Sequence, residues 1–404
     1  MKALIITFGT EGDVRPMAAL GAALGEAGHA VQFLATEDTA EAARALAVPT
    51  AVLPGAVRAP LGAAGTTGNA NSAAALARVV NDNTSAWLKL ALEHGAGCDV
   101  VIAGGLAAFV GFSAAEKLGV PGVGAAMFPI TPTAAFASPF FPPGGPAWAN
   151  RLTHRIANGL VWRSFARATN AARREVGLST GRRVWTDNPA LYGFSPRLVP
   201  RPADWPANAA VCGLWAKPTT DWTPPDSLAA FLDAGEPPIY VGFGSMTLAD
   251  PRRLLAALTA GIAGRRALFY PGWSGIAQPD LPPNFHAPLP KGRGPQRLRR
   301  LAVGSSGEGP VSAAMQRPGA TQSRHLSQWR EPSPPSVSLA ARICVAEAVD
   351  ERAKARGGAA LGFPNLVPVS AHAGQREQRA EVLPRASVLF GIHEVRLVLK
   401  VVVF

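Results

Sequence analysis

Cysteine is scarce in this chain of 404 residues, and so are long uninterrupted apolar runs. The three cysteines, Cys98, Cys212 and Cys344, have no paired spacing, which argues against a disulfide framework and a zinc site. No window of about 18 residues is free of charge, proline and glycine, so we predict no transmembrane helix. The apolar stretch before Gly9 is too short for the core of a signal peptide. We therefore expect a cytoplasmic protein.

Acidic residues are fewer than basic ones, but the imbalance lies mainly in the last part of the chain. The net charge is +12, yet residues 1–290 hold 22 basic and 19 acidic side chains. Residues 291–404 hold the other 17 basic and 8 acidic ones. A basic region can bind nucleic acid or an anionic membrane. These charges are scattered and form no recognisable nucleic-acid-binding motif, so we expect no nucleic-acid partner.

What the chain does contain is an alternation of strand and helix signals. Apolar runs at Ala3–Phe8, Val31–Ala35 and Asp99–Ala103 are separated by segments with helical spacing. This order predicts an α/β fold with a parallel sheet. The length suits two domains with well-buried cores.

The most informative segment is the turn after the first predicted strand. Phe8 ends that strand, Gly9 and Gly12 follow, and Asp13 stands where the next helix begins. Ligands of parallel α/β sheets bind at the carboxyl ends of the strands, beside helix N-termini. Asp13 is therefore a candidate catalytic carboxylate in a cleft. The alternative is that Asp13 only caps the helix, a position that aspartate favours.

The run from Gly9 to Pro16, followed by Gly25–His29 and the strand Val31–Ala35, carries a resemblance. It resembles the opening of glycosyltransferases of the sterol glucosyltransferase and antibiotic-aglycone type, with a family 28 N-terminal domain. The resemblance implies two Rossmann-like domains (the GT-B fold). It also implies that Asp13 is the general base that activates an acceptor hydroxyl, and it assigns Thr10 and Gly12 to the nucleotide-sugar site.

A loop without charge follows the strand near residue 126. Residues 118–150 contain seven prolines and several aromatic side chains, Phe128 and Trp148 among them. Such a loop could line an apolar acceptor pocket or pack between domains. The segment Pro129–Phe136 looks like the family's segment before the acceptor region, which favours the pocket.

The resemblance continues into a second domain. Leu191–Trp205 and Val211–Trp215 are similar to the sterol glucosyltransferase subgroup. We expect an acceptor-binding domain over residues 1–215, a linker over 216–236, and the start of a sugar-nucleotide-binding domain over 237–290. In that last segment the resemblance implies that Gly244 and Ser245 hold the donor diphosphate and that Trp273 lies near the nucleotide.

The likeness ends near Pro290. Relatives continue with a His-His-Gly-Gly loop for the pyrophosphate and an Asp-Gln pair for the sugar, and residues 291–404 contain neither. Arginine outnumbers lysine fourteen to three there, as expected when a GC-rich gene is read out of frame. Our hypothesis is a divergent basic tail produced by a frameshift near Pro290, which leaves the second domain incomplete or irregular.

The sequence predicts a glycosyltransferase that moves a hexose from a UDP- or dTDP-sugar to an apolar acceptor, with no permanent cofactor and no metal. A lipid or sterol acceptor would bring it to a membrane surface, although no anchor is visible. One alternative is an inactive remnant that only binds an apolar ligand. Another is a nicotinamide-dependent oxidoreductase, for which Glu37 and Asp38 follow the second strand but the G-x-G-x-x-G order is missing.

Overall fold

The computed structural model describes residues 1–64, 69–142, 144–216, 224–245, 250–276 and 280–287. Within these ranges the chain forms two parallel sheets, one of seven strands and one of three. Parallel sheets with intervening helices confirm the predicted α/β class. The predictions of an irregular second domain after about residue 290 and of a frameshifted tail lie outside the described residues.

The first sheet has the strand order β3-β2-β1-β4-β5-β6-β7, and every neighbouring pair is parallel. Its strands are β1 (Lys2–Phe8), β2 (Ala30–Thr36), β3 (Thr50–Leu53), β4 (Val100–Gly105), β5 (Gly122–Ala126), β6 (Ala190–Tyr192) and β7 (Ala209–Val211). The chain builds outward from β1 to β3 and then returns to add β4 on the other side of β1. All seven carboxyl ends consequently lie at one edge of the sheet.

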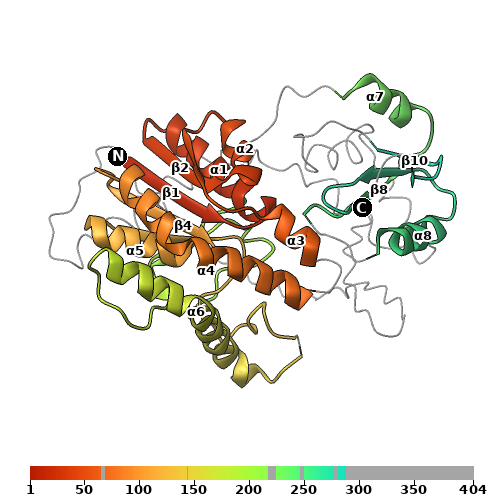
Figure 1. Ribbon diagram of the computed structural model, residues 1–404. Helices are drawn as coiled ribbons and strands as arrows, with labels where there is room; N and C mark the ends of the chain where they lie inside the picture. Colours follow the sequence, from red (N-terminus) through yellow and green to blue (C-terminus); the bar gives the residue numbers. More distant parts are fainter. Residues whose placement is uncertain (65–68, 143, 217–223, 246–249, 277–279, 288–404) are drawn as a thin grey trace, which may run out of the picture. The chain divides into compact units, whose positions relative to one another are not determined.

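Helices cover both faces of this sheet (Figure 1). They are α1 (Glu11–Glu26) and α2 (Glu37–Arg44) on one face, α4 (Asn69–His94) and α5 (Ala108–Leu118) on the other, and α6 (Asn150–Glu175) packed on α4 and α5. The strands are buried on both faces, which explains their nearly continuous apolar runs. In β1 the side chain of Ile5 faces α1, whereas Phe8 faces α4 and packs on Trp87 with ring centroids 4.9 Å apart.

Short elements complete this part of the chain. They are α3 (Arg58–Ala64) and the single-turn helices η1 (Ala147–Ala149) and η2 (Trp185–Asp187). Among the described residues, no helix has both the length and the apolar character needed to cross a bilayer.

The second sheet has the order β10-β9-β8 and is also parallel. Its elements are β8 (Ile239–Gly242), β9 (Ala267–Tyr270) and β10 (Phe285–His286), with the helices α7 (Asp226–Asp233) and α8 (Pro251–Ile262). Phe269 of β9 packs with the apolar side of α8, and Leu268 faces Leu228 of α7. Helices therefore lie on both faces, as in the first sheet. The domain boundaries expected above stay a prediction.

Candidate active site

Asp13 lies inside the first turn of α1. The helix begins at Glu11, two residues before Asp13, and Thr10 is its N-cap. The backbone N–H of Thr10 donates to Asp13 Oδ2 at 2.8 Å, and the Thr10 hydroxyl lies 3.3 Å from the same oxygen. The two residues thus form a capping box, with aspartate in the place usually taken by glutamate. Asp13 therefore contributes to capping from position N3, as the partner of the N-cap residue Thr10, and its catalytic role stays a prediction.

Glycine at position 9 makes room for this carboxylate. A Cβ atom built on Gly9 would lie 2.2 Å from Asp13 Oδ2 and 2.6 Å from its Cγ. The φ angle of Gly9 lies outside the left-handed region, so backbone conformation does not require glycine here. The requirement is steric: the Asp13 carboxylate lies directly against the backbone of Gly9.

The two oxygens of Asp13 differ in their surroundings. Oδ2 is held by Thr10, whereas no described residue forms a hydrogen bond with Oδ1. Burial raises the pKa of the carboxyl above its ordinary 3.8, and the hydrogen bonds from Thr10 lower it in part. A carboxylate with a raised pKa is the stronger base, and general bases work best with a pKa near the operating pH.

The position of Asp13 in the sheet is that of a ligand site. The strand order reverses between β1 and β4, and open α/β sheets bind ligands at such a switch point, outside the carboxyl ends. The ends of these two strands are in close contact. Leu106 N–H donates to the carbonyl of Phe8 at 2.9 Å, and Gly105 has φ +56°. A Cβ on Gly105 would lie 2.2 Å from that carbonyl oxygen, so glycine is required there.

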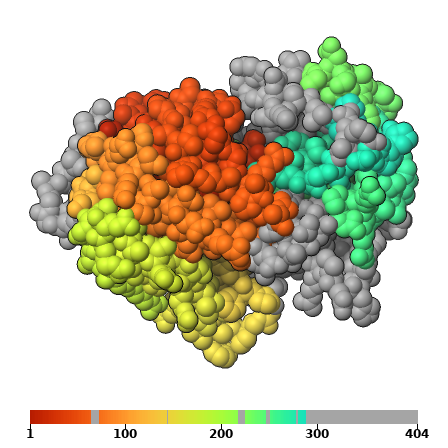
Figure 2. Space-filling model, viewed as in Figure 1, coloured from red at the N-terminus to blue at the C-terminus, as the bar shows by residue number. Residues whose placement is uncertain are grey.

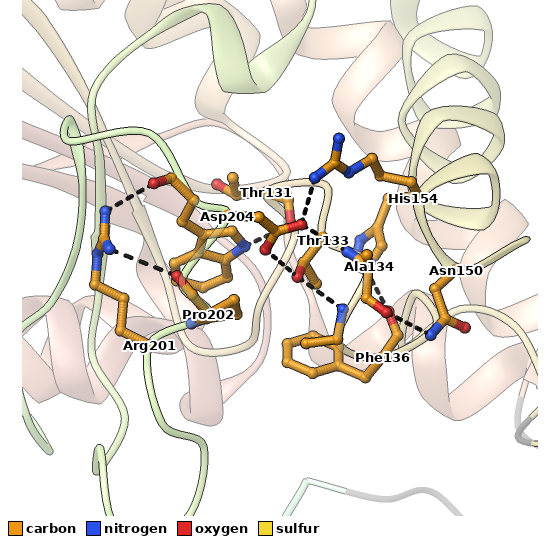
Figure 3. A network of polar contacts seen from close by, with 12 residues as sticks. Thr131, Thr133, Ala134, Phe136, Asn150, His154, Arg201, Pro202 and Asp204 are labelled. Atoms are coloured by element: carbon orange, nitrogen blue, oxygen red, sulfur yellow. Dashed lines mark hydrogen bonds and ion pairs between the residues drawn. The ribbon is translucent and has the colours of Figure 1, made fainter. Parts of the chain in front are cut away.

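The uncharged loop after β5 starts at the same edge of the sheet, and a polar network anchors it (Figure 3). Asp204 accepts hydrogen bonds from the Thr133 hydroxyl at 2.6 Å and the Ala134 N–H at 2.8 Å, and it pairs with Arg151 of α6 at 2.6 Å. These contacts, first the Thr133 hydroxyl and then Arg151, hold the pKa of Asp204 well below its usual range. Asp204 therefore joins the loop to the first turn of α6.

A second group of contacts anchors the loop near Thr131. The Thr131 N–H donates to the Tyr192 hydroxyl at 2.8 Å, and Trp205 Nε1 donates to the Thr131 carbonyl at 3.1 Å. The rings of Tyr192 and Trp205 stack with centroids 4.7 Å apart. His154 of α6 holds the Phe136 carbonyl through Nε2 at 3.1 Å, and burial lowers the pKa of this imidazole (Figure 3). The aromatic side chains Phe128 and Trp148 are 38% and 81% exposed.

In the second sheet, the turns after β8 and β9 meet. Trp273 N–H donates to the carbonyl of Gly244 at 2.8 Å. Gly244 and Gly272 have φ +57° and +54°, and a Cβ on Gly272 would lie 1.9 Å from the Gly244 oxygen. Ser245 follows Gly244 and is partly buried. The structure thus brings three of the predicted donor residues, Gly244, Ser245 and Trp273, to the carboxyl edge of one sheet. Their role in binding stays a prediction.

The acidic residues that supported an oxidoreductase are engaged in the local fold. Both oxygens of Asp38 accept hydrogen bonds, from the Thr36 hydroxyl and from the N–H groups of Val57 and Arg58. Glu37 forms two hydrogen bonds with Arg44. Both oxygens of Asp38 are thus occupied by the local fold, and Glu37 forms a surface ion pair, so the geometry gives no support to that alternative. In the part of the chain that the structure describes, no group of three His, Cys, Asp or Glu is arranged to hold a metal.

Sequence reasoning missed two features of this site. The first is the steric role of Gly9, which depends on the rotamer of Asp13. The second is the anchoring role of Asp204, whose partner Thr133 lies 71 residues away. The segment Leu191–Trp205, which the sequence analysis singled out, was the available signal for the role of Asp204. Its side chains cannot be matched to their partners without knowledge of the strand order.

Comparison with known proteins agrees with this description. Residues 3–137 match the glycosyltransferase family 28 N-terminal domain. The vancomycin aglycone glucosyltransferase of Amycolatopsis orientalis is 30% identical over 294 residues, which cover 69% of each chain. A sterol 3-beta-glucosyltransferase of Emericella nidulans is 32% identical over 197 residues, which cover 45% of this chain and 14% of that enzyme. The chain belongs to the glycosyltransferase family that these enzymes represent.

Solved structures with similar folds include the glycotransferase of kitacinnamycin, with a TM-score of 0.48, 15% identity and 70% of each chain covered. The glycosyltransferase VinC in complex with dTDP has a TM-score of 0.42, 16% identity and 71% of each chain covered.

Proposed function

We propose that this protein transfers a hexose from a nucleotide-sugar donor, UDP- or dTDP-linked, to a hydroxyl group of an apolar acceptor, with inversion at the anomeric carbon. Asp13 takes the proton of the acceptor hydroxyl as that oxygen attacks the anomeric carbon. The bond from this carbon to the diphosphate breaks, and the leaving nucleoside diphosphate keeps the electron pair.

The observation that carries the proposal is the state of the Asp13 carboxylate. One oxygen is fixed by Thr10, and the other has no hydrogen-bond partner among the described residues and can receive a proton. Its raised pKa and its place beside the β1/β4 switch point suit a general base. Membership in a glycosyltransferase family supports the reaction class.

The donor side of the proposal rests on the paired turns of the second sheet. Backbone N–H groups at Gly244 and Ser245, and the Ser245 hydroxyl, would stabilise the negative charge that develops on the leaving diphosphate. Trp273 offers an aromatic ring close to the same turns. The predicted acceptor site is the loop that Asp204 and Tyr192 anchor.

Replacing Asp13 with asparagine tests the base. Asparagine keeps an oxygen that can accept from Thr10, and the change removes a partly buried charge. A carboxyl whose pKa is raised by folding loses stabilisation as the pH rises through that pKa, so Asp13→Asn should not lower the Tm at pH 7. Transfer should fall by about 10²–10⁴-fold, the usual contribution of a general base.

The measurement is release of nucleoside diphosphate together with mass detection of the glycosylated acceptor. The matched control is Asp82→Asn, which changes an exposed aspartate on α4 and should leave the rate unchanged. Wild-type turnover in Asp13→Asn would remove this residue from the mechanism.

A second candidate function is supported by the absence of the His-His-Gly-Gly and Asp-Gln motifs from the sequence after residue 290. In that case the protein binds an apolar ligand without transferring a sugar. Calorimetric titration with UDP and dTDP, and separately with an apolar acceptor, distinguishes the two. Acceptor binding without nucleotide binding or transfer would favour the remnant.

A further inference from the structure

The outer side of α6 carries an exposed apolar stripe. Trp148, in the turn just before the helix, is 81% exposed, and Leu152, Ile156 and Leu160 are 49%, 42% and 56% exposed. Leu152, Ile156 and Leu160 recur every fourth residue, so they follow one side of α6, and Trp148 of η1 precedes them at the same spacing. Soluble proteins rarely leave such a row of large apolar side chains open, and contiguous apolar patches mark interaction sites.

This stripe lies opposite the side by which α6 joins the protein. His154, Ala157 and Phe165 are buried, and the last two belong to the packed side of the helix. Figure 2 shows residues 150–175, in yellow to yellow-green, at the surface of the face in view. The stripe is therefore not needed to hold α6 on α4 and α5.

The same outer side turns strongly basic toward the end of the helix. Residues 151–183 contain eight arginines and one glutamate. Arg163, Arg167 and Arg174 are exposed, continue the line of Ile156 along the helix, and form no ion pair with any residue that the structure describes. One face thus combines an apolar half with an unpaired cationic half.

A shallow, open depression lies where the two halves meet. Its volume is about 410 Å³, and it is lined by Ile156, Gly159, Leu160, Trp162, Arg163 and Arg182. Its mainly apolar lining suits a hydrocarbon segment. The two arginines at its edge suit a phosphate group, because guanidinium binds phosphate in a bidentate manner.

We propose that the outer side of α6 docks on the surface of an anionic lipid bilayer. Trp148, Leu152, Ile156 and Leu160 would enter the boundary between headgroups and acyl chains, a depth at which tryptophan is favoured. The arginines of the helix would bind lipid phosphates. A second copy of this chain is the poorer occupant, because α6 offers these arginines only one acidic residue, Glu175, and that residue already pairs with Lys89.

The test is co-sedimentation of the full chain with vesicles of phosphatidylcholine alone and of equal parts phosphatidylcholine and phosphatidylglycerol. We expect binding only to the anionic vesicles, and weaker binding as salt is raised. Arg163→Gln with Arg167→Gln should weaken binding about 30-fold, since each basic residue near an anionic surface contributes about 1 kcal/mol. Ile156→Gln with Leu160→Gln should weaken it at least about tenfold through lost apolar burial.

Matched controls separate this surface from general effects. Arg252→Gln with Arg253→Gln removes two exposed arginines of α8, and Leu198→Gln with Leu214→Gln removes two exposed leucines outside α6. Both should bind as the wild type does. All changes are at exposed positions, and the Tm of each variant checks that it folds.

Absence of binding to anionic vesicles at low salt would overturn the proposal, as would equal binding by the α6 variants and the wild type. A wild-type dimer that the Ile156→Gln, Leu160→Gln variant converts to a monomer would assign the stripe to a contact between copies instead. Vesicle binding needs no sugar donor, so this test is independent of the transfer reaction.

Discussion

Alanine at position 9 is the smallest change that tests whether the Asp13 carboxylate must lie where the structure has it. The added methyl group would lie 2.2, 2.6 and 2.8 Å from Oδ2, Cγ and Cβ of Asp13. Its three nearest neighbours thus all belong to Asp13. Because the φ of Gly9 is open to alanine, the strain falls on that side chain and not on the backbone.

The size of the effect follows from the distances. To bring Oδ2 to an ordinary contact distance, the carboxylate must move by roughly 1 Å, and a misplacement of that size costs about 10²-fold in rate. The hydrogen bonds with Thr10 would weaken at the same time. We therefore expect a fall of about 100-fold in kcat, with a smaller change in the KM of the sugar donor, whose diphosphate we propose to bind at Gly244 and Ser245.

Gly25→Ala is the matched control. A Cβ on Gly25 would have no atom within 4 Å, and Gly25 is exposed in the last turn of α1, away from the predicted site. This variant should keep wild-type kcat. The assay is initial-rate release of nucleoside diphosphate, with the Tm as a check on folding. Equal kcat for Gly9→Ala and the wild type, or an equal loss in Gly25→Ala, would refute the reasoning.

Three further outcomes are expected. Burial raises the pKa of Asp13, and a general base must be ionised to act. In a pH–rate profile, kcat/KM should therefore fall on acidification with an apparent pKa above 3.8. An apparent pKa at or below 3.8 would contradict this. Folding lowers the pKa of Asp204, so the stabilisation that this carboxylate provides is present above its ordinary pKa of 3.8 and is lost as the pH falls. Asp204→Asn should therefore lower the Tm at pH 7. The Tm difference between this variant and the wild type should shrink below pH 3.8. Gly272→Ala would drive a methyl group into the Gly244 carbonyl, so the KM for the nucleotide sugar should rise, whereas Gly261→Ala, with no atom within 4 Å, should leave the KM unchanged.

Local signals in the sequence were sufficient for the first strand, the glycine turn and the helix after it. The apolar run that ends at Phe8 became β1, and the periodic residues from Met17 to Leu24 became the buried side of α1. Both follow from short-range periodicity, which the sequence carries directly. The parallel α/β class followed in the same way, because strand and helix signals alternate along the chain.

The sequence also placed Asp13 at the carboxyl end of the first strand, but it left open whether this residue caps the helix or acts on a ligand. The tertiary structure makes Thr10 the cap and Asp13 its partner, and it leaves one carboxylate oxygen without a hydrogen bond among the described residues. That distinction depends on a single rotamer packed against Gly9. Periodicity contains no information about it.

Only the tertiary structure decided the features that depend on pairing of distant segments. The order β2-β1-β4 puts the switch point beside Asp13, and the contact between Asp204 and Thr133 closes 71 residues of chain. The exposure of Ile156 and its neighbours also depends on how distant segments pack together. A helix with apolar residues on two sides can bury either one, and α6 buries the side of Phe165 because that side meets α4 and α5. Burial is a property of the packed molecule, so no local pattern could assign it.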